Sequence, residues 1–215
     1  MGSNQLQNRE INQSILMRDA RSDLSGRWGT AVAIMLIYMV VSIGSSFLSF
    51  VSILISGPLA LGFAMVGLGF AKQDHVEVAT LFDGFKNFGK AIGVTILMGL
   101  GIVVGFILLV IPGIILALGW GMSMFILADN PHMRVIDVLS ASWDLTNGYK
   151  FDLFILALKF LVLGILCLLT LGIGFLFLSP YYQTVMGKFY LELKIAKGLD
   201  AVSYTHLTLP TTPYV

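Results

Sequence analysis

The residues of this sequence that could do chemistry lie mostly inside its apolar segments. Lys159 stands deep within an apolar run, and a second run carries Ser179, Tyr182 and Gln183 close together. Ionisable and amide groups in such surroundings are typical of a substrate or ion route through a membrane. Two structural alternatives stay open: the Lys159 stem can reach the membrane surface with help from Asp152, and Gln183 can join helices by hydrogen bonds.

Catalytic motifs give no support for an enzyme. The sequence contains no H-E-x-x-H pattern, no G-x-S-x-G elbow, no phosphate-binding loop and no dinucleotide fingerprint. Its single cysteine, Cys167, lies in an apolar run, and its three histidines lack zinc-ligand spacing. Asp129, Asn130 and His132 could imitate a metal or acid–base cluster, but Asn130-Pro131 is typical of a helix N-terminus. We therefore expect neither catalytic activity nor a bound cofactor or metal.

The composition indicates a membrane protein. Of 215 residues, 57% are hydrophobic and 12% are charged, with a mean hydropathy of +0.88. Soluble domains carry about 45–50% apolar and about 25% charged residues, so this chain has too little polar surface for a water-soluble globule. The net charge of +1 also argues against a nucleic-acid partner. The expected partners are the lipid bilayer and either other membrane proteins or a second copy.

Six apolar runs predict membrane-spanning helices, each of which needs about 20 residues. The runs cover 29–55, 57–71, 91–111, 112–128, 151–171 and 172–195. Between paired runs, helix breaks are predicted at Gly57 and Pro58, at Pro112 and Gly113, and at Gly172, with a further kink at Pro180. The expected fold is an all-α, polytopic transmembrane bundle of six spans in three hairpins, forming one membrane domain over residues 1–201.

Charge placement predicts the orientation. The three expected turns contain no charged residue, whereas nearly all Lys and Arg residues lie in the segments at the opposite ends of the runs. By the positive-inside rule, both termini and both long loops face the cytoplasm. The tail at 202–215, VSYTHLTLPTTPYV, resembles a translated sequencing adapter and is excluded from the fold prediction.

An internal repeat organises the runs. Repeats are predicted at 9–71, 76–128 and 132–195, each an amphipathic interfacial helix followed by a hairpin. An aspartate and an aromatic residue recur at the same spacing in each repeat. The aromatic residues expected to anchor the interface are Trp28, Phe88, Trp143 and Tyr149.

Five segments carry a family resemblance. In chain order they are LFDGFKNFGKAIG, VIPGII, FILADNP, NGYK and PYYQTVMGKFY. Over residues 8–193 the chain resembles a bacterial family of multi-pass membrane proteins known as domain of unknown function number nine hundred seventy-five. The resemblance implies six helices in the bacterial cytoplasmic (inner) membrane and brings no activity or cofactor. A looser likeness to membrane portions of some glycerophosphodiester phosphodiesterases implies a lipid-facing module.

Three functions follow from these observations. The first is a non-enzymatic module that contacts lipid or assists assembly. The second is a small transporter or channel with a polar route near Lys159 and Gln183. The third is an enzyme acting on lipid head groups at the cytoplasmic face.

Overall fold

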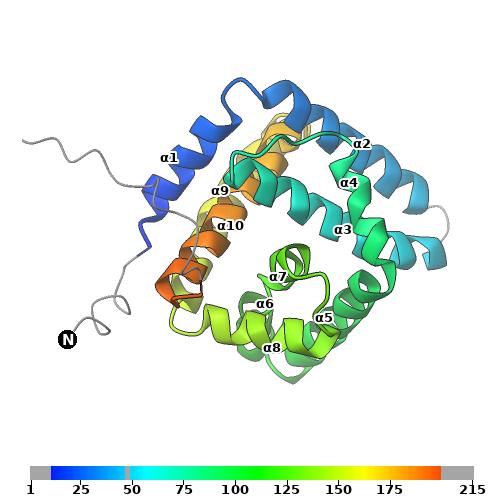
Figure 1. Ribbon diagram of the computed structural model, residues 1–215, viewed down its shortest axis with the longest axis vertical. Coiled ribbons are helices and arrows are strands. Elements are labelled where there is room, and N and C mark those ends of the chain that lie inside the picture. Colours follow the sequence, from blue (N-terminus) through cyan, green and yellow to red (C-terminus); the bar gives the residue numbers. More distant parts are fainter. Residues whose placement is uncertain (1–10, 47–48, 200–215) are drawn as a thin grey trace, which may run out of the picture.

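The protein folds into helices throughout the part that the computed structural model describes, residues 11–46 and 49–199 (Figure 1). The tail at 202–215 lies outside the described residues. In chain order the elements are α1 (Gln13–Leu24), α2 (Trp28–Ser46), α3 (Ser49–Ala71), α4 (Thr80–Asp83), the 3₁₀ helix η1 (Gly84–Asn87), α5 (Phe88–Leu108), α6 (Val110–Gly119), α7 (Ser123–Asp129), α8 (Val135–Thr146), α9 (Lys150–Leu169) and α10 (Phe175–Ala196). The all-α prediction is confirmed.

Helices α3 and α10 form the centre of the packing, and glycines bring their backbones together. A Cβ atom on Gly67 would lie 2.6 Å from the carbonyl oxygen of Gln183, and one on Gly187 would lie 2.8 Å from that of Gly67. Small residues of this kind allow close helix approach where lipid supplies little driving force between helices.

Glycines also allow close packing between α3 and the short segment made of α4 and η1. A Cβ atom on Gly62 would lie 1.8 Å from the carbonyl oxygen of Leu81, and one on Gly84 would lie 2.0 Å from that of Pro58. Backbone therefore packs directly on backbone here, and no side chain fits between the two segments.

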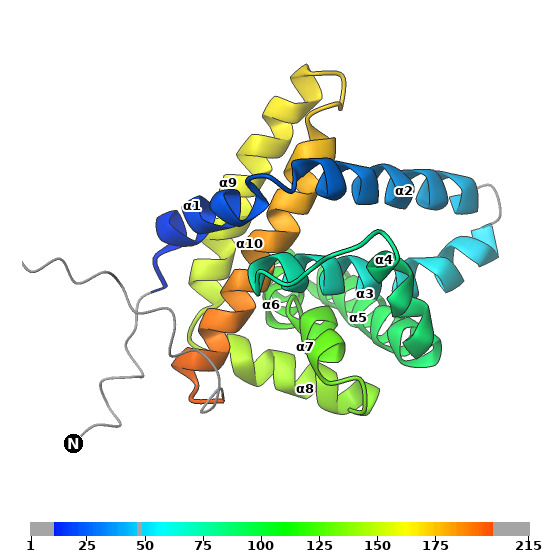
Figure 2. The same cartoon turned by 45° about the horizontal axis from the view of Figure 1, so that its top comes forward.

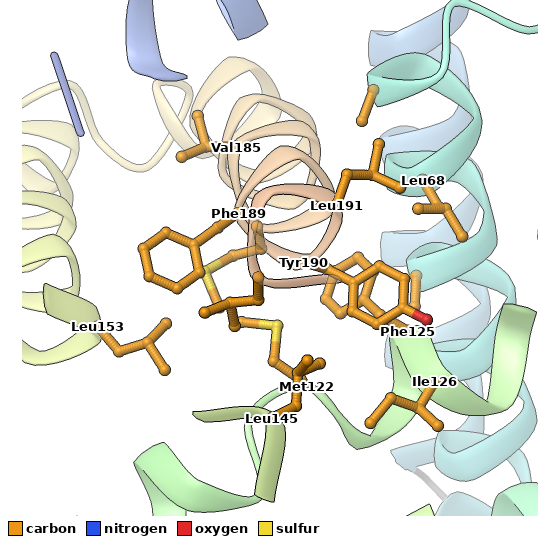
Figure 3. Packing of buried hydrophobic residues seen from close by; sticks show 14 of the residues in the cluster. Leu68, Met122, Phe125, Ile126, Leu145, Leu153, Val185, Phe189, Tyr190 and Leu191 are labelled. Atoms are coloured by element: carbon orange, nitrogen blue, oxygen red, sulfur yellow. The ribbon is translucent and has the colours of Figure 1, made fainter. Parts of the chain in front are cut away.

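An apolar core surrounds the last helix. Figure 3 shows Phe189 of α10 directed toward Leu153 of α9, and Tyr190 directed toward Phe125 of α7. The Phe125 and Tyr190 rings stack with centroids 6.1 Å apart. Met122, which precedes α7, is fully buried in the same cluster. Helix α10 thus packs against elements from the whole length of the chain.

Among the described residues, four helical segments are long and apolar enough to cross a membrane: Leu54–Ala71, Thr80–Leu108, Val110–Asp129 and Lys150–Leu169. A fifth arises if α1 and α2, which meet at 95°, count as one bent span. The six predicted spans are therefore not all found. Helix α10 falls short because its polar cluster near Pro180 is followed by Lys188 and Glu192.

Two of the three predicted helix breaks are wrong. Gly57 and Pro58 lie inside α3, and Pro112 and Gly113 lie inside α6. Gly57 serves packing instead of a turn, because a Cβ atom there would lie 2.9 Å from the carbonyl oxygen of Ala91. Neighbouring helices that pack this closely let a membrane helix tolerate an internal proline.

The turns fall elsewhere in the first two pairs. Helix α2 ends before residues 47–48, which lie outside the described part, and the α5–α6 break is the extended residue Leu109. Pro112 is the third residue of α6, where its missing N–H leaves no helical bond unmade. The α9–α10 turn runs over 170–174 and contains Gly172 in the left-handed region at φ 85°. Pro180 lies within α10.

The run predicted at 112–128 is divided in two. Helix α6 ends at Gly119 and α7 begins at Ser123, with a turn between them.

Helices lie at all three predicted interfacial positions: α1, the short α4–η1 segment and α8. Their placement at a membrane surface and the threefold repeat remain predictions. Figure 2 shows the α9–α10 pair rising steeply while α2 runs across the view from beside α10, so α2 does not run parallel to this pair.

Candidate functional site

Asp129, the last residue of α7, is the centre of a charged cluster that joins three helices. Its Oδ1 atom lies 2.9 Å from Nζ of Lys72, which follows α3. Its Oδ2 atom lies 2.8 Å from Nζ of Lys194 near the end of α10. The Tyr190 hydroxyl donates to the same Oδ2 atom at 3.1 Å. We call Lys72, Asp129, Tyr190 and Lys194 the Asp129 cluster.

The Asp129 cluster is largely withdrawn from solvent. The side chains of Asp129, Lys72 and Lys194 are 17%, 26% and 18% exposed. Lys72 and Asp129 border a pocket of about 260 Å³, which Asp74, His75 and Thr80 also line. Both carboxylate oxygens of Asp129 already accept hydrogen bonds from Lys72, Tyr190 and Lys194. This arrangement favours a structural role, in which Asp129 holds the ends of the helices together, over proton transfer.

A second buried ion pair joins the first helix to the last. Nζ of Lys188 in α10 lies 2.5 Å from Oδ2 of Asp23 in α1, and their side chains are only 14% and 5% exposed. Nε2 of Gln73 donates to the other carboxylate oxygen at 2.8 Å. Asp23, the repeated aspartate of the first predicted repeat, is therefore paired across the fold with α10.

Lys159 has a partner that the sequence did not indicate. Its Nζ atom donates to Oε1 of Gln13 at 2.7 Å, and Nε2 of Gln13 donates to the backbone oxygen of Asp152 at 2.9 Å. The backbone of Asp152 therefore holds Lys159 indirectly, through a buried glutamine of α1. This arrangement ties α1 to α9.

Replacing Lys159 by methionine is expected to lower the free energy of unfolding by about 2 kcal/mol, because the nearly buried Oε1 of Gln13 loses a charged donor. Lys159→Arg, which keeps a donor, should lose less. Thermal unfolding in detergent measures both variants. Equal stability of Lys159→Met and the native chain would contradict this role.

The described residues show no contact that gathers the predicted polar route into one site. The Tyr182 ring packs edge-on against Phe160 of α9, with centroids 4.9 Å apart, and is partly exposed. The backbone of Gln183 faces Gly67. Ser179 is half-buried, one turn before Gln183 on the same helix.

The predicted interfacial anchors lie in different surroundings. Trp28 packs against Phe177 with ring centroids 6.0 Å apart, while Phe88 is exposed. Trp143 lies beneath Lys150, whose Nζ atom is 3.3 Å from the ring centroid. Tyr149 is half-buried and packs against the core.

The expected helix N-terminus at Asn130-Pro131 is wrong. Helix α8 begins at Val135 with Arg134 as its N-cap residue, and Nδ2 of Asn130 donates back to the oxygen of Ile126 in α7 at 3.4 Å. The polar side chain of Asn130 therefore bonds to the helix that ends before it.

Sequence reasoning missed the partners of Asp129 and Asp23. It assigned Lys72, Lys188 and Lys194 only to membrane orientation. The available signal was an acidic residue at the end of an apolar run, since a carboxylate withdrawn from water requires a cation or hydrogen-bond donors.

An all-helical fold with several apolar spans indicates a membrane protein. Residues 100–197 match the model of a family described as "Protein of unknown function (DUF975)". The match confirms the resemblance that the ordered sequence motifs carry, over this part of the chain. Among curated proteins and solved structures, none matches the chain.

Proposed function

We propose that the protein is a non-enzymatic, multi-pass module of the bacterial cytoplasmic membrane that acts by contacting lipid. In this proposal both termini face the cytoplasm. The observation that carries it is the unequal burial of the apolar helices. In the apolar 18-residue stretch of each of the segments Thr80–Leu108 and Lys150–Leu169, only 17% of residues are buried within the fold, against 67% for Leu54–Ala71.

The exposed apolar surface continues across two turns. Around the α5–α6 break the large side chains are 61–78% exposed; these are Ile107, Leu108, Leu109, Val110 and Ile111. At the α9–α10 turn Leu169 and Leu171 are 79% and 94% exposed. Contiguous apolar surface of this kind marks membrane or protein contact, because soluble proteins rarely expose it.

Charged groups follow the opposite pattern. The Asp129 cluster lies at the end of α7 and near the end of α10, and the Asp23–Lys188 pair joins the end of α1 to the interior of α10. Neither α5 past Lys90 nor the α5–α6 break contains a charged residue. This separation supports insertion of the α5–α6 turn into hydrocarbon with the charged end near the membrane surface.

Leu108→Glu is expected to weaken membrane insertion, because a carboxylate within hydrocarbon costs about 3 kcal/mol. Vesicle flotation and resistance to alkaline extraction measure the effect. The matched control is Ile136→Glu on α8, whose side chain is 69% exposed and stands in a predicted surface helix. Equal insertion of the two variants would contradict the proposal.

A further inference from the structure

A groove of about 510 Å³ opens between α1, α9 and α10. This volume lies within the range of about 300–1,000 Å³ that small-molecule sites occupy. Its lining is mostly apolar, and the residues that define its walls are Met17 and Arg21 from α1, Leu163 and Cys167 from α9, and Phe177 and Leu178 from α10. The Tyr181 hydroxyl donates to the backbone oxygen of Met17 at 2.9 Å, which fixes α1 against α10 beside the groove.

Arg21 is the one charged residue in this lining. It is exposed, and within the described part of the chain it has no ion pair or hydrogen bond. Its neighbours are engaged: Arg18 pairs with Asp19, and Arg27 donates to the backbone oxygen of Asp74. The groove therefore combines an apolar channel with a cation that the fold leaves without an anion.

We propose that this groove binds an anionic phospholipid, with an acyl chain along α9 and α10 and the phosphate against Arg21. The inference rests on the proposed function, because the groove meets lipid only if the helices insert in a membrane. A guanidinium donates paired hydrogen bonds to phosphate oxygens, and these are stronger than bonds between neutral groups. The apolar walls can pack against a hydrocarbon chain, but they provide no hydrogen-bond donor to a free, hydrated phosphate ion.

Charge complementarity favours lipid over a second copy of the chain. A twofold contact through this groove would place the same patch of both molecules together and bring two Arg21 side chains near each other. Like charges in such a contact repel each other, whereas a lipid phosphate neutralises Arg21.

The test uses Trp28, which also lines the groove, as a fluorescent reporter. Trp120→Phe and Trp143→Phe leave Trp28 as the only tryptophan of the full chain. The protein is placed in phosphatidylcholine vesicles that contain either brominated phosphatidylglycerol or brominated phosphatidylcholine, and quenching is measured against mole fraction. We expect about a fivefold preference for the anionic lipid. Arg21→Gln should abolish it.

Arg18→Gln is the matched control, because it removes an exposed arginine from the same helix outside the groove lining. It should retain most of the preference. Equal preference in the two variants, or no preference in the native groove, overturns the proposal. A separate variant tests the proposed function: Leu108→Trp in a chain without other tryptophans places a tryptophan at the α5–α6 turn. If the turn does not insert into the membrane and the proposed function is wrong, neither brominated lipid quenches this tryptophan.

A second measurement needs no tryptophan substitutions. Cys167 is the only cysteine in the chain and lines the groove, so its alkylation by a maleimide reports occupancy. In detergent micelles, added phosphatidylglycerol should slow the reaction severalfold more than phosphatidylcholine, and Arg21→Gln should remove the difference. Slowing by inorganic phosphate alone would assign the site to a free anion and overturn the proposal. Equal slowing by both lipids would also overturn it.

Discussion

Gly62→Ala is expected to lower the free energy of unfolding by about 3 kcal/mol, which is the upper part of the usual range for overpacking. The added methyl group would lie 1.8 Å from the backbone oxygen of Leu81. A backbone atom cannot rotate away as a side chain does, so α3 and α4 must separate. Unfolding in detergent, followed by circular dichroism against temperature or dodecyl sulfate, measures the loss.

Gly99→Ala is the matched control. Gly99 also lies inside a long apolar helix, α5, but among the described residues no atom outside its own stretch of helix lies within 4 Å of the position that a Cβ atom would take. Alanine has the higher helix propensity, so this variant should be unchanged or more stable by up to about 1 kcal/mol. A similar loss in both variants would show that the α3–α4 contact is unimportant.

Asp129→Asn is expected to cost on the order of 3 kcal/mol, because it leaves two largely buried lysines without their carboxylate. Asparagine keeps the size of the side chain, so the loss reports charge more than shape. The same unfolding measurements apply. The control is Asp137→Asn, which breaks an exposed ion pair with Arg134 and should cost less than about 1 kcal/mol.

A combined variant separates the loss of charge from the loss of packing. Adding Lys194→Met to Asp129→Asn removes one of the two ammonium groups that have lost the Asp129 carboxylate, and should recover part of the stability. If the double variant is less stable than Asp129→Asn alone, the lysine contributes mainly through its other contacts, and the account of the Asp129 cluster is wrong.

The helices were predictable from the sequence, because continuous apolar runs must satisfy their backbone groups internally when they leave water. The positions of the helix breaks were less predictable, because glycine and proline occur in such helices both at turns and at close packing contacts. Gly172 has a positive φ within a turn, whereas Gly57 allows α3 to approach α5. Residue type alone does not separate these two uses.

The Asp129 cluster could not be predicted from the sequence, for a different reason. Lys72 and Lys194 are 57 and 65 residues from Asp129, and nothing in local spacing relates them. Asp129 itself was considered, but only with its neighbours Asn130 and His132. Their pattern indicated a helix start that the fold does not use.

The pairing of Asp23 with Lys188 has a consequence for synthesis. A chain emerges from the ribosome from its amino end at about 5–20 residues per second, so the acid of α1 precedes its lysine by many seconds. Asp129 is likewise synthesised before its partner Lys194. Until α10 is made, Asp23 and Asp129 lack these two lysine partners, so a chain whose translation stops before α10 keeps both acids without them.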